Sequence, residues 1–299
     1  MTITAFIFPG QGGQFVGQGR EWAKNDPGSA RLFQLADQAS GRPIGRLSLE
    51  GPLEELSRTE NLQPAVLAVG LAAARQLRLR GVEPAFAAGH SLGEYGALAL
   101  AGVISEEKAF ALVARRSELM AMAAEGAGGS MSAILGLAPE MVEAVCELAR
   151  HEGQVVAANF NSPQQTVISG EARAVAAAVR FAGLKGGKAV PLPVTGAFHS
   201  PLMAQASEAF ARILDETEFA RPLFPVAPNA SGRPTDDPDE LRDLLKRQMT
   251  SPVLWTRTIE GLAAAGAESF VECWPKAYLG PLIRKTLGPA HKAQVSAAS

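Results

Sequence analysis

Residues 86–95 read Phe-Ala-Ala-Gly-His-Ser-Leu-Gly-Glu-Tyr, and this stretch decides the fold. Its first three residues are typical of a buried strand, and an amphipathic helical pattern begins at Leu92. The Gly-x-Ser-x-Gly run between them predicts a tight strand-to-helix turn that exposes a serine hydroxyl. Side chains two places before and after the serine would collide in such a turn, so glycine is needed at 89 and 93. We therefore predict that Ser91 is a nucleophile that forms an acyl-enzyme; the alternative is a glycine-rich turn with an incidental serine.

Short apolar runs alternate with helical periods on both sides of this turn. The expected strands are 4–8, 84–88 and 269–273, and the expected helices are 63–80, 92–101, 106–124, 201–217, 240–249 and 251–265. Alternation of this kind is typical of an α/β layer built on a parallel sheet. A loop is expected at 221–228, and a frayed tail is expected at the C-terminus. The sequence thus predicts a larger, α/β-hydrolase-like catalytic domain formed by residues 1–125 and 196–299.

A different rhythm occupies the middle of the chain. It begins at a glycine-rich break, Gly126-Ala127-Gly128-Gly129, and its elements follow the order β-α-β-β-α-β. The expected strands are 130–135, 155–161, 166–169 and 189–193, and the expected helices are 139–151 and 173–184. That order is typical of a small ferredoxin-like unit. We therefore predict a ferredoxin-like insertion domain over residues 126–195, with a ligand cleft between it and the larger domain.

The composition of the chain excludes several classes of protein. The 299 residues are 47% hydrophobic and 19% charged, with a formal net charge of −2 and no block of Lys and Arg, so no nucleic-acid or anionic-membrane surface is expected. Cys146, Cys273 and the four histidines stand apart from one another, so we expect reduced structural thiols and no metal site. The N-terminus lacks the basic lead of a signal peptide, and Arg75 and Arg78 interrupt the most apolar helix. A cytoplasmic protein without a membrane span is expected.

A serine nucleophile needs a base, and His199 is the best candidate among the four histidines. His90 adjoins the nucleophile, and its side chain should point to the opposite side of the turn. His151 lies at the C-terminus of an expected helix, where a cation meets the helix dipole favourably, and His291 lies in the tail. His199 follows a strand and a turn of small residues, Thr195-Gly196-Ala197, so it lies at the expected domain junction.

The usual third member of a serine triad is missing. No aspartate lies between Ser91 and His199, although an α/β-hydrolase triad usually places its acid there. The glutamates in this interval fall mostly in helical surface patterns. We infer that a backbone carbonyl or an amide orients His199 instead. The missing aspartate counts against an ordinary esterase.

Arg116 falls on the apolar stripe of the helix expected at 106–124, whereas Arg115 shares another face with Glu118 and is expected to be solvated. An unpaired guanidinium on the apolar side would be costly, so Arg116 needs an anion. That anion is either a protein carboxylate or the free carboxylate of a substrate, which arginine holds bidentately. The helical pattern alone gives both interpretations equal weight.

Four motifs occur in order along the chain: Phe8-Pro9-Gly10-Gln11-Gly12, Gly89-His90-Ser91-Leu92-Gly93-Glu94-Tyr95, Arg116, and Gly196-Ala197-Phe198-His199. Together they resemble the malonyl-CoA:acyl carrier protein transacylases of fatty acid synthesis, to which the acyltransferase domains of polyketide synthases are related. The resemblance covers essentially the whole chain, including the ferredoxin-like insertion. It implies a family fold of two domains and an acyltransferase activity.

The resemblance also implies a role for each matching residue. Ser91 would take the malonyl group, and His199 would act first as a base and then as an acid. The main-chain N–H groups of Gln11 and Leu92 would form the oxyanion hole, and Arg116 would hold the malonyl carboxylate.

Three further residues match positions that line the family's site. The main-chain carbonyl of Gln248 would orient the histidine, which would explain why no triad aspartate is needed. Gln63 would be a polar residue beside the substrate. Phe198 looks like the malonyl-selective form, because a bulky aromatic leaves little room for an α-methyl branch. Ordinary turn or helix polarity is the alternative for Gln11, Gln63 and Gln248. One segment departs from the family: Cys273-Trp274-Pro275-Lys276 stands where a Gly-Pro-Gly turn is common. The resemblance therefore does not predict the backbone near the entrance of the site, or how a carrier protein docks there.

The expected reaction is a two-step transfer from malonyl-CoA, through a malonyl-serine, to the phosphopantetheine thiol of acyl carrier protein. No metal or bound cofactor is required, and a monomer is expected. The rivals are a thioesterase or esterase with the same nucleophile and a catalytically silent subunit that only binds acyl carrier proteins. Arg116 and the missing aspartate argue against the hydrolase, and the intact Ser91, His199 and Arg116 argue against the silent subunit. Transfer to a polyketide or malonate-decarboxylase carrier remains an open variant.

Overall fold

The computed structural model describes residues 2–126, 128–194 and 196–298, and two separate sheets organise them. Five parallel strands form the first sheet, in the order β7-β2-β1-β8-β9. Their bounds are Thr4–Phe8 (β1), Phe86–Gly89 (β2), Val226–Ala227 (β7), Ser269–Glu272 (β8) and Gln294–Ala297 (β9). We call this sheet with its flanking helices the parallel layer.

Strand β1 shows why the parallel layer has helices on both faces. Its side chains alternate between the faces, as they do in any strand, and every one of its residues is buried. Phe6 and Phe8 pack into the apolar cluster that contains helices α5, α6 and α7, while Ala5 and Ile7 pack on the side of α12 and α13. A strand that is buried on both faces reads as a continuous apolar run, which is the pattern that parallel sheets require.

The helices on one side of the parallel layer include Thr59–Leu79 (α5), Glu106–Ala124 (α7) and Ala204–Asp215 (α10). The other helices are Arg20–Asn25 (α1), Pro27–Ser40 (α2), Ile44–Glu50 (α3), Leu53–Leu56 (α4), Gly93–Leu100 (α6), Pro238–Lys246 (α11), Trp255–Ala264 (α12) and Gly280–Leu287 (α13). Short 3₁₀ turns occur at Pro201–Met203 and Gln248–Thr250. No helix among the described residues is both long and apolar enough to cross a membrane.

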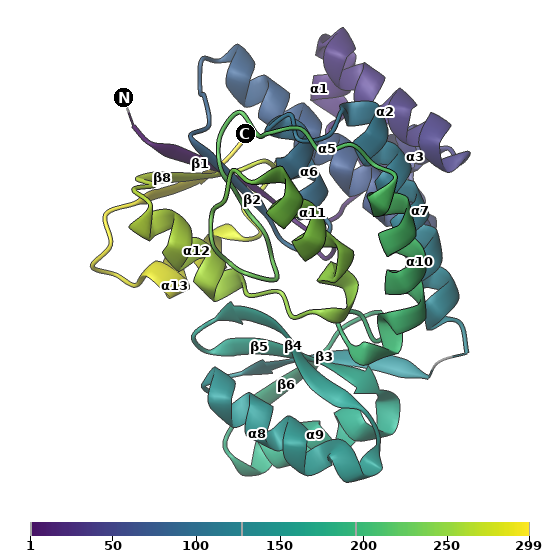
Figure 1. Cartoon of the computed structure of the whole chain (residues 1–299), viewed down its shortest axis with the longest axis vertical. Coiled ribbons are helices and arrows are strands. Elements are labelled where there is room, and N and C mark those ends of the chain that lie inside the picture. Colours follow the sequence, from purple (N-terminus) through teal and green to yellow (C-terminus); the bar gives the residue numbers. More distant parts are fainter. Residues whose placement is uncertain (1, 127, 195, 299) are drawn as a thin grey trace.

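Four antiparallel strands form the second sheet, in the order β4-β5-β3-β6. The strands and helices alternate along the chain as Gly129–Leu135 (β3), Pro139–Ala149 (α8), Val155–Ser162 (β4), Gln165–Glu171 (β5), Ala172–Leu184 (α9) and Lys188–Pro191 (β6). We call these elements the antiparallel unit. Figure 1 shows α8 and α9 on its outer face, while the other face of its sheet turns toward the parallel layer. Asn159 and Phe160 of β4 meet Val253 there through a bridge and a backbone hydrogen bond.

The expected elements of the antiparallel unit and the helix at 106–124 are confirmed, with ends that shift by a few residues. Four other helices differ. The helix expected at 63–80 begins four residues earlier, at Thr59, because Pro64 is tolerated inside it. The helix expected at 251–265 begins only at Trp255, because Val253 is held by the backbone of β4. The helix expected at 201–217 opens with a 3₁₀ turn, and the one expected at 240–249 ends at Lys246.

Two regions expected to be irregular contain strands. The C-terminal tail was expected to be frayed, which is wrong: β9 adds a parallel strand to β8, and the amide of Ala298 donates to the carbonyl of Trp274. The loop expected at 221–228 contains the edge strand β7. The sequence did not predict the four helices before α5, nor helix α13 after β8. Ala127 of the glycine-rich break, Thr195 of the turn before His199, and the terminal Met1 and Ser299 lie outside the described residues.

Candidate active site

The turn between β2 and α6 holds Ser91 in a strained conformation. Ser91 has φ 51°, in the left-handed region that non-glycine residues rarely adopt. A Cβ on Gly89 would lie 1.9 Å from the carbonyl carbon of Gly93, and a Cβ on Gly93 would lie 2.2 Å from the carbonyl oxygen of Phe8. The first distance confirms the predicted collision across the turn, whereas the second shows that glycine is needed at 93 because the end of β1 passes beside it. The hydroxyl of Ser91 therefore stands out from the end of the sheet on a rigid support.

His199 lies directly beside the nucleophile. Its Nε2 is 2.7 Å from Ser91 Oγ, and its Nδ1 is 3.0 Å from the carbonyl oxygen of Gln248 and 3.2 Å from that of Ser251. Because a carbonyl only accepts, Nδ1 must carry the proton, which leaves Nε2 free to accept from the serine hydroxyl. Burial, and then the nearby positive charge of Arg116, lower the pKa of His199 to about 3, so the imidazole is neutral at physiological pH.

Among the described residues, no hydrogen bond or ion pair of the other three histidines involves the Ser91 hydroxyl. His90 Nε2 is 2.8 Å from Asn161 Oδ1 of the antiparallel unit, and its ring packs edge-on against Trp255. His90 nevertheless lines the same cavity as Ser91, so its side chain spans the two sheets instead of pointing away from the site. His151 is exposed and within 3.6 Å of Glu152, and His291 lies in the exposed segment before β9.

Arg116 of α7 is fully buried and touches the nucleophile. Its Nη2 donates to Ser91 Oγ over 3.1 Å and to Gln248 Oε1 over 3.0 Å, and its Nη1 donates to Gln63 Oε1 over 2.6 Å. No carboxylate forms an ion pair with this guanidinium among the described residues. Two neutral amides thus hold a buried positive charge against the serine oxygen. Arg115, by contrast, is half exposed, as expected, and it pairs with Glu118 at 3.0 Å.

Two residues that the sequence did not single out bind the turn around Ser91. The side chain of Asn229, which follows β7, accepts from the amide of Ser91 and donates to the carbonyl of Gly89, each over 2.6 Å. Glu94 Oε2 accepts from the backbone amide of Asn229 over 3.1 Å and from Gln248 Nε2 over 2.7 Å. Glu94 is only 1% exposed, and burial raises its pKa to about 7. In the sequence, only the position of Glu94 in the Gly-His-Ser-Leu-Gly-Glu run connects it with the site. No sequence pattern connects Asn229 with it.

The main-chain amides of Gln11 and Leu92 are the expected oxyanion donors. Neither donates to another group in the backbone and side-chain hydrogen bonds of the described residues. Leu92 is the residue before α6, and Gln11 follows β1, so both lie at the same end of the sheet. Gly10 allows the loop after β1 to approach closely, because a Cβ there would lie 2.6 Å from the carbonyl oxygen of His90.

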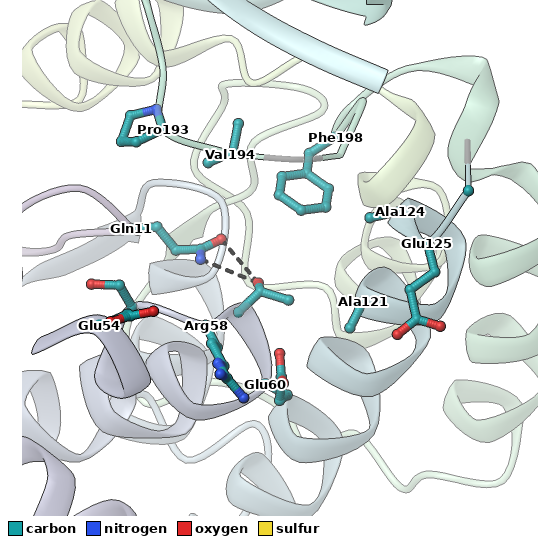
Figure 2. A pocket seen from close by; sticks show the side chains of 13 residues that line it. Gln11, Glu54, Arg58, Glu60, Ala121, Ala124, Glu125, Pro193, Val194 and Phe198 are labelled. Carbon is teal, nitrogen blue, oxygen red and sulfur yellow. Dashed lines mark hydrogen bonds between the residues drawn. The ribbon is translucent and has the colours of Figure 1, made fainter. Parts of the chain in front are cut away.

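A cavity of about 150 Å³ opens beside Ser91, between the parallel layer and the antiparallel unit. It is lined by residues of both, including Met120, Asn161, Phe198, His199 and Tyr278. A larger hollow of about 550 Å³ adjoins it and shares Gln11, Val194 and Phe198 (Figure 2). In Figure 2 the ring of Phe198 stands across this hollow from Gln11, whose side chain is hydrogen-bonded to Thr59. Phe198 and Gln11 thus lie where the hollow and the cavity beside Ser91 meet.

The segment that departs from the expected Gly-Pro-Gly turn supports the loop after β1. Trp274 is buried, and its Nε1 donates to the carbonyl of Gly13 over 3.3 Å. The ring of Tyr278 lies over Gly12 and Gly13 at the edge of the cavity. The side chain of Lys276 lies 4.5 Å from the centre of the Phe15 ring.

Within the described ranges no group of three His, Cys, Asp or Glu side chains could hold a metal ion.

The family model described as the acyl transferase domain matches residues 5–298, nearly the whole chain. The chain belongs to the acyl transferase family. It is 39% identical over 287 residues to the malonyl CoA-acyl carrier protein transacylase of Bacillus subtilis, covering 95% of this chain and 90% of that protein. It is 41% identical over 290 residues to the Escherichia coli K12 protein of the same name, covering 95% of this chain and 93% of that protein.

Solved structures of the family agree with these relatives. An acyl carrier protein S-malonyltransferase from Vibrio cholerae superposes with a TM-score of 0.93 at 38% identity, covering 99% of this chain and 96% of that one. A malonyl-transacylase in complex with its type II polyketide synthase acyl-carrier protein superposes with a TM-score of 0.92 at 36% identity, covering 99% and 95% of the two chains. The chain is therefore an acyltransferase, and the resemblance inferred from its motifs is confirmed.

Proposed function

We propose that this acyltransferase moves a malonyl group from malonyl-CoA to the phosphopantetheine thiol of acyl carrier protein, and so supplies fatty acid synthesis. The observation that carries the proposal is the double contact at Ser91 Oγ. A neutral imidazole lies 2.7 Å from this oxygen on one side, and a buried guanidinium lies 3.1 Å from it on the other. The first suits acyl transfer, and the second suits an acyl group with a free carboxylate. The names of the relatives support the same substrates.

In the first step, Ser91 Oγ attacks the thioester carbonyl of malonyl-CoA while its proton passes to His199 Nε2. The carbonyl oxygen of Gln248 holds Nδ1–H, so the ring keeps the tautomer that this transfer needs. The amides of Gln11 and Leu92 donate to the oxyanion as it forms. The C–S bond then breaks, and the CoA sulfur leaves with the proton that His199 returns.

The second step repeats the first with the carrier as the nucleophile. The thiol of phosphopantetheine gives its proton to His199 and attacks the ester carbonyl of the malonyl-serine. The bond to Ser91 Oγ breaks, the oxygen takes the proton back, and malonyl thioester leaves on the carrier. No redox change and no bound cofactor enter either step. Water must be kept from the ester for transfer to exceed hydrolysis, and the narrow cavity beside Ser91 suits that requirement.

Arg116 is the proposed partner of the malonyl carboxylate. This carboxylate lies only one methylene beyond the ester carbonyl, so a malonyl group on Ser91 Oγ places it within reach of the guanidinium. Gln63 and Gln248 accept from Arg116 without neutralising it, because amide oxygens have no net charge. Phe198, which is 7% exposed at the cavity, is proposed to leave no room for an α-methyl branch.

The organisation of the chain belongs to the same proposal. We assign residues 1–125 and 196–299 to an α/β-hydrolase-like catalytic domain and residues 126–195 to a ferredoxin-like insertion. The order β4-β5-β3-β6 supports the second assignment, because a ferredoxin-like unit places its first and third strands at the centre. A cytoplasmic monomer that meets acyl carrier protein in solution completes the proposal.

The deciding experiment mixes the protein with malonyl-CoA and measures its intact mass. The expected result is an added malonyl group on Ser91, which disappears when acyl carrier protein is supplied and reappears on the carrier. Ser91→Ala should form no adduct. Release of free malonate in place of malonyl carrier would favour the hydrolase, and normal transfer by Ser91→Ala would sink the proposal.

A further inference from the structure

Glu94 is a buried carboxylate near the nucleophile for which the proposed reaction has no role. It belongs to α6, three residues after Ser91, and it does not line the cavity described above. Burying a carboxylate is costly unless its hydrogen bonds are worth more than the lost hydration. The two hydrogen bonds that Glu94 accepts come from Gln248 and Asn229, and both of those residues touch the reacting groups.

The contacts of the Gln248 side chain fix which way its amide faces. Its Nε2 donates to the main-chain carbonyl of Ser91 over 3.0 Å and to Glu94 Oε2 over 2.7 Å, while its Oε1 accepts from Arg116. A flipped amide would set its oxygen against two acceptors and its NH₂ group against a guanidinium, which is also a donor. The carboxylate of Glu94 therefore favours the one orientation in which Gln248 presents an acceptor to Arg116.

The same glutamine also meets the base. Its main-chain carbonyl accepts from His199 Nδ1, so a fixed Gln248 holds both the imidazole and the guanidinium at Ser91 Oγ. The second arm of Glu94 reaches the backbone of Asn229, whose side chain bridges the amide of Ser91 and the carbonyl of Gly89 across the strained turn.

We propose that Glu94 is a positioning residue of the acyl transfer: its carboxylate orients Gln248 and Asn229, and through them His199, Arg116 and the turn at Ser91. It contacts no substrate, and it takes the place of a triad aspartate only indirectly. This positioning role depends on the length of the Glu94 side chain and on its acceptor oxygen, not on its charge. The inference rests on the proposed function for its substrate, but not for the geometry at Ser91.

Two conservative variants separate reach from charge. Glu94→Gln keeps the length of the side chain and an acceptor oxygen but loses the charge. Glu94→Asp keeps the charge but shortens the side chain by one methylene, so it cannot hold both partners. We expect Glu94→Gln to load malonyl within about threefold of the wild-type rate, and Glu94→Asp to be slower by roughly 10- to 100-fold, equivalent to about 1.4–2.8 kcal/mol. Slower loading by Glu94→Gln than by Glu94→Asp would overturn the proposal.

A double-variant cycle shows whether Glu94 acts through the glutamine. In a Gln248→Met background the link is already broken, so adding Glu94→Asp should cost no more than about threefold. A full 10- to 100-fold loss in that background would mean that Glu94 does not act through Gln248, and the proposed link from Glu94 to His199 and Arg116 would fail. Unfolding midpoints of all variants, measured alongside, should not follow the same order as the rates; an identical order would assign Glu94 a purely structural role.

A probe that needs no malonyl group keeps this test separate from the proposed function. A serine-directed sulfonyl fluoride should modify Ser91 at a rate that depends on the turn and on His199, and the same order of variants is expected. If the wild-type protein reacts with the sulfonyl fluoride but never takes malonyl, the substrate assignment fails. The reaction rates of the Glu94 variants with the sulfonyl fluoride still test the positioning role. If all variants react with the sulfonyl fluoride at the wild-type rate, the role of Glu94 is refuted.

Discussion

Replacing Arg116 with alanine tests the charge that distinguishes this site from an ordinary serine hydrolase. The guanidinium is fully buried, and its donors reach Ser91 Oγ and two amide oxygens. A malonyl group on Ser91 would set its carboxylate against this cation, whereas an acetyl group offers no carboxylate. Loss of Arg116 should therefore lower malonyl loading much more than acetyl loading.

The size of the effect follows from burial. Truncating one partner of a buried, hydrogen-bonded charge pair costs about 2–5 kcal/mol. Because each 1.4 kcal/mol corresponds to a factor of ten, the ratio of malonyl to acetyl loading should fall by about 30-fold to several thousandfold. The contact between Arg116 and the serine oxygen is lost for both substrates, so it lowers both rates without changing their ratio.

The assay is rapid-quench mass spectrometry of the acyl-enzyme formed from malonyl-CoA or acetyl-CoA. Arg115→Ala is the matched control, because this neighbour in the same helix is half exposed and pairs with Glu118. The control should leave the ratio within about twofold of wild type, as surface pairs contribute little. Equal losses of malonyl and acetyl loading in Arg116→Ala would refute the assignment of this residue to the carboxylate.

Three further predictions concern the turn, the cavity and the pH dependence of stability. Gly89→Ala places a Cβ 1.9 Å from the backbone of Gly93, so we expect loss of acylation and a markedly lower unfolding temperature; wild-type values for both would contradict the steric account. Phe198→Ala enlarges the cavity of about 150 Å³, so loading of methylmalonyl relative to malonyl should rise roughly tenfold or more, the effect of about 1.4 kcal/mol of relieved overlap; an unchanged ratio would remove Phe198 from the selectivity. Burial raises the pKa of Glu94 from 4.5 to about 7, so the folded protein loses stability as the pH rises through this window and the carboxyl ionises. Glu94→Gln lacks this penalty, so urea titrations should show its stability relative to wild type rising between pH 5 and pH 8 by up to about 3 kcal/mol; a constant difference would contradict the raised pKa.

The parts of the fold that the sequence predicts correctly are those with strong local signals. The helix Glu106–Ala124 is capped by the Ser105 side chain and has a clear apolar stripe, so its bounds follow from nearby residues. The turn at Ser91 is equally local, because the collision between Gly89 and Gly93 depends on five consecutive residues. Arg116 could be placed on a buried face by helical spacing alone.

The parts that were missed depend on residues far apart in the chain. Strand β9 has only four residues and no long apolar run, and it forms because the edge of β8 offers backbone groups to pair with. Helix α13 begins where the buried carboxylate of Glu272 accepts the amides of Tyr278, Leu279 and Gly280, a cap from outside the helix. Asn229 acquires its place at the turn only because β7 pairs with β2. No pattern within a short window contains this information.

The missing aspartate and the buried arginine belong to one electrostatic arrangement. His199 and Arg116 both touch Ser91 Oγ, so an ionised acid that oriented the imidazole directly would lie close to the guanidinium as well. It would pair with Arg116 and occupy the charge proposed to hold the malonyl carboxylate. The carbonyls of Gln248 and Ser251 orient the imidazole without offering a competing anion, and they leave the pKa of His199 low enough for a neutral base. The nearby carboxylate, Glu94, lies behind the Gln248 amide, and its raised pKa further weakens its claim on Arg116. If the site accepts a negatively charged acyl group, as proposed, it gains from orienting its base with neutral groups.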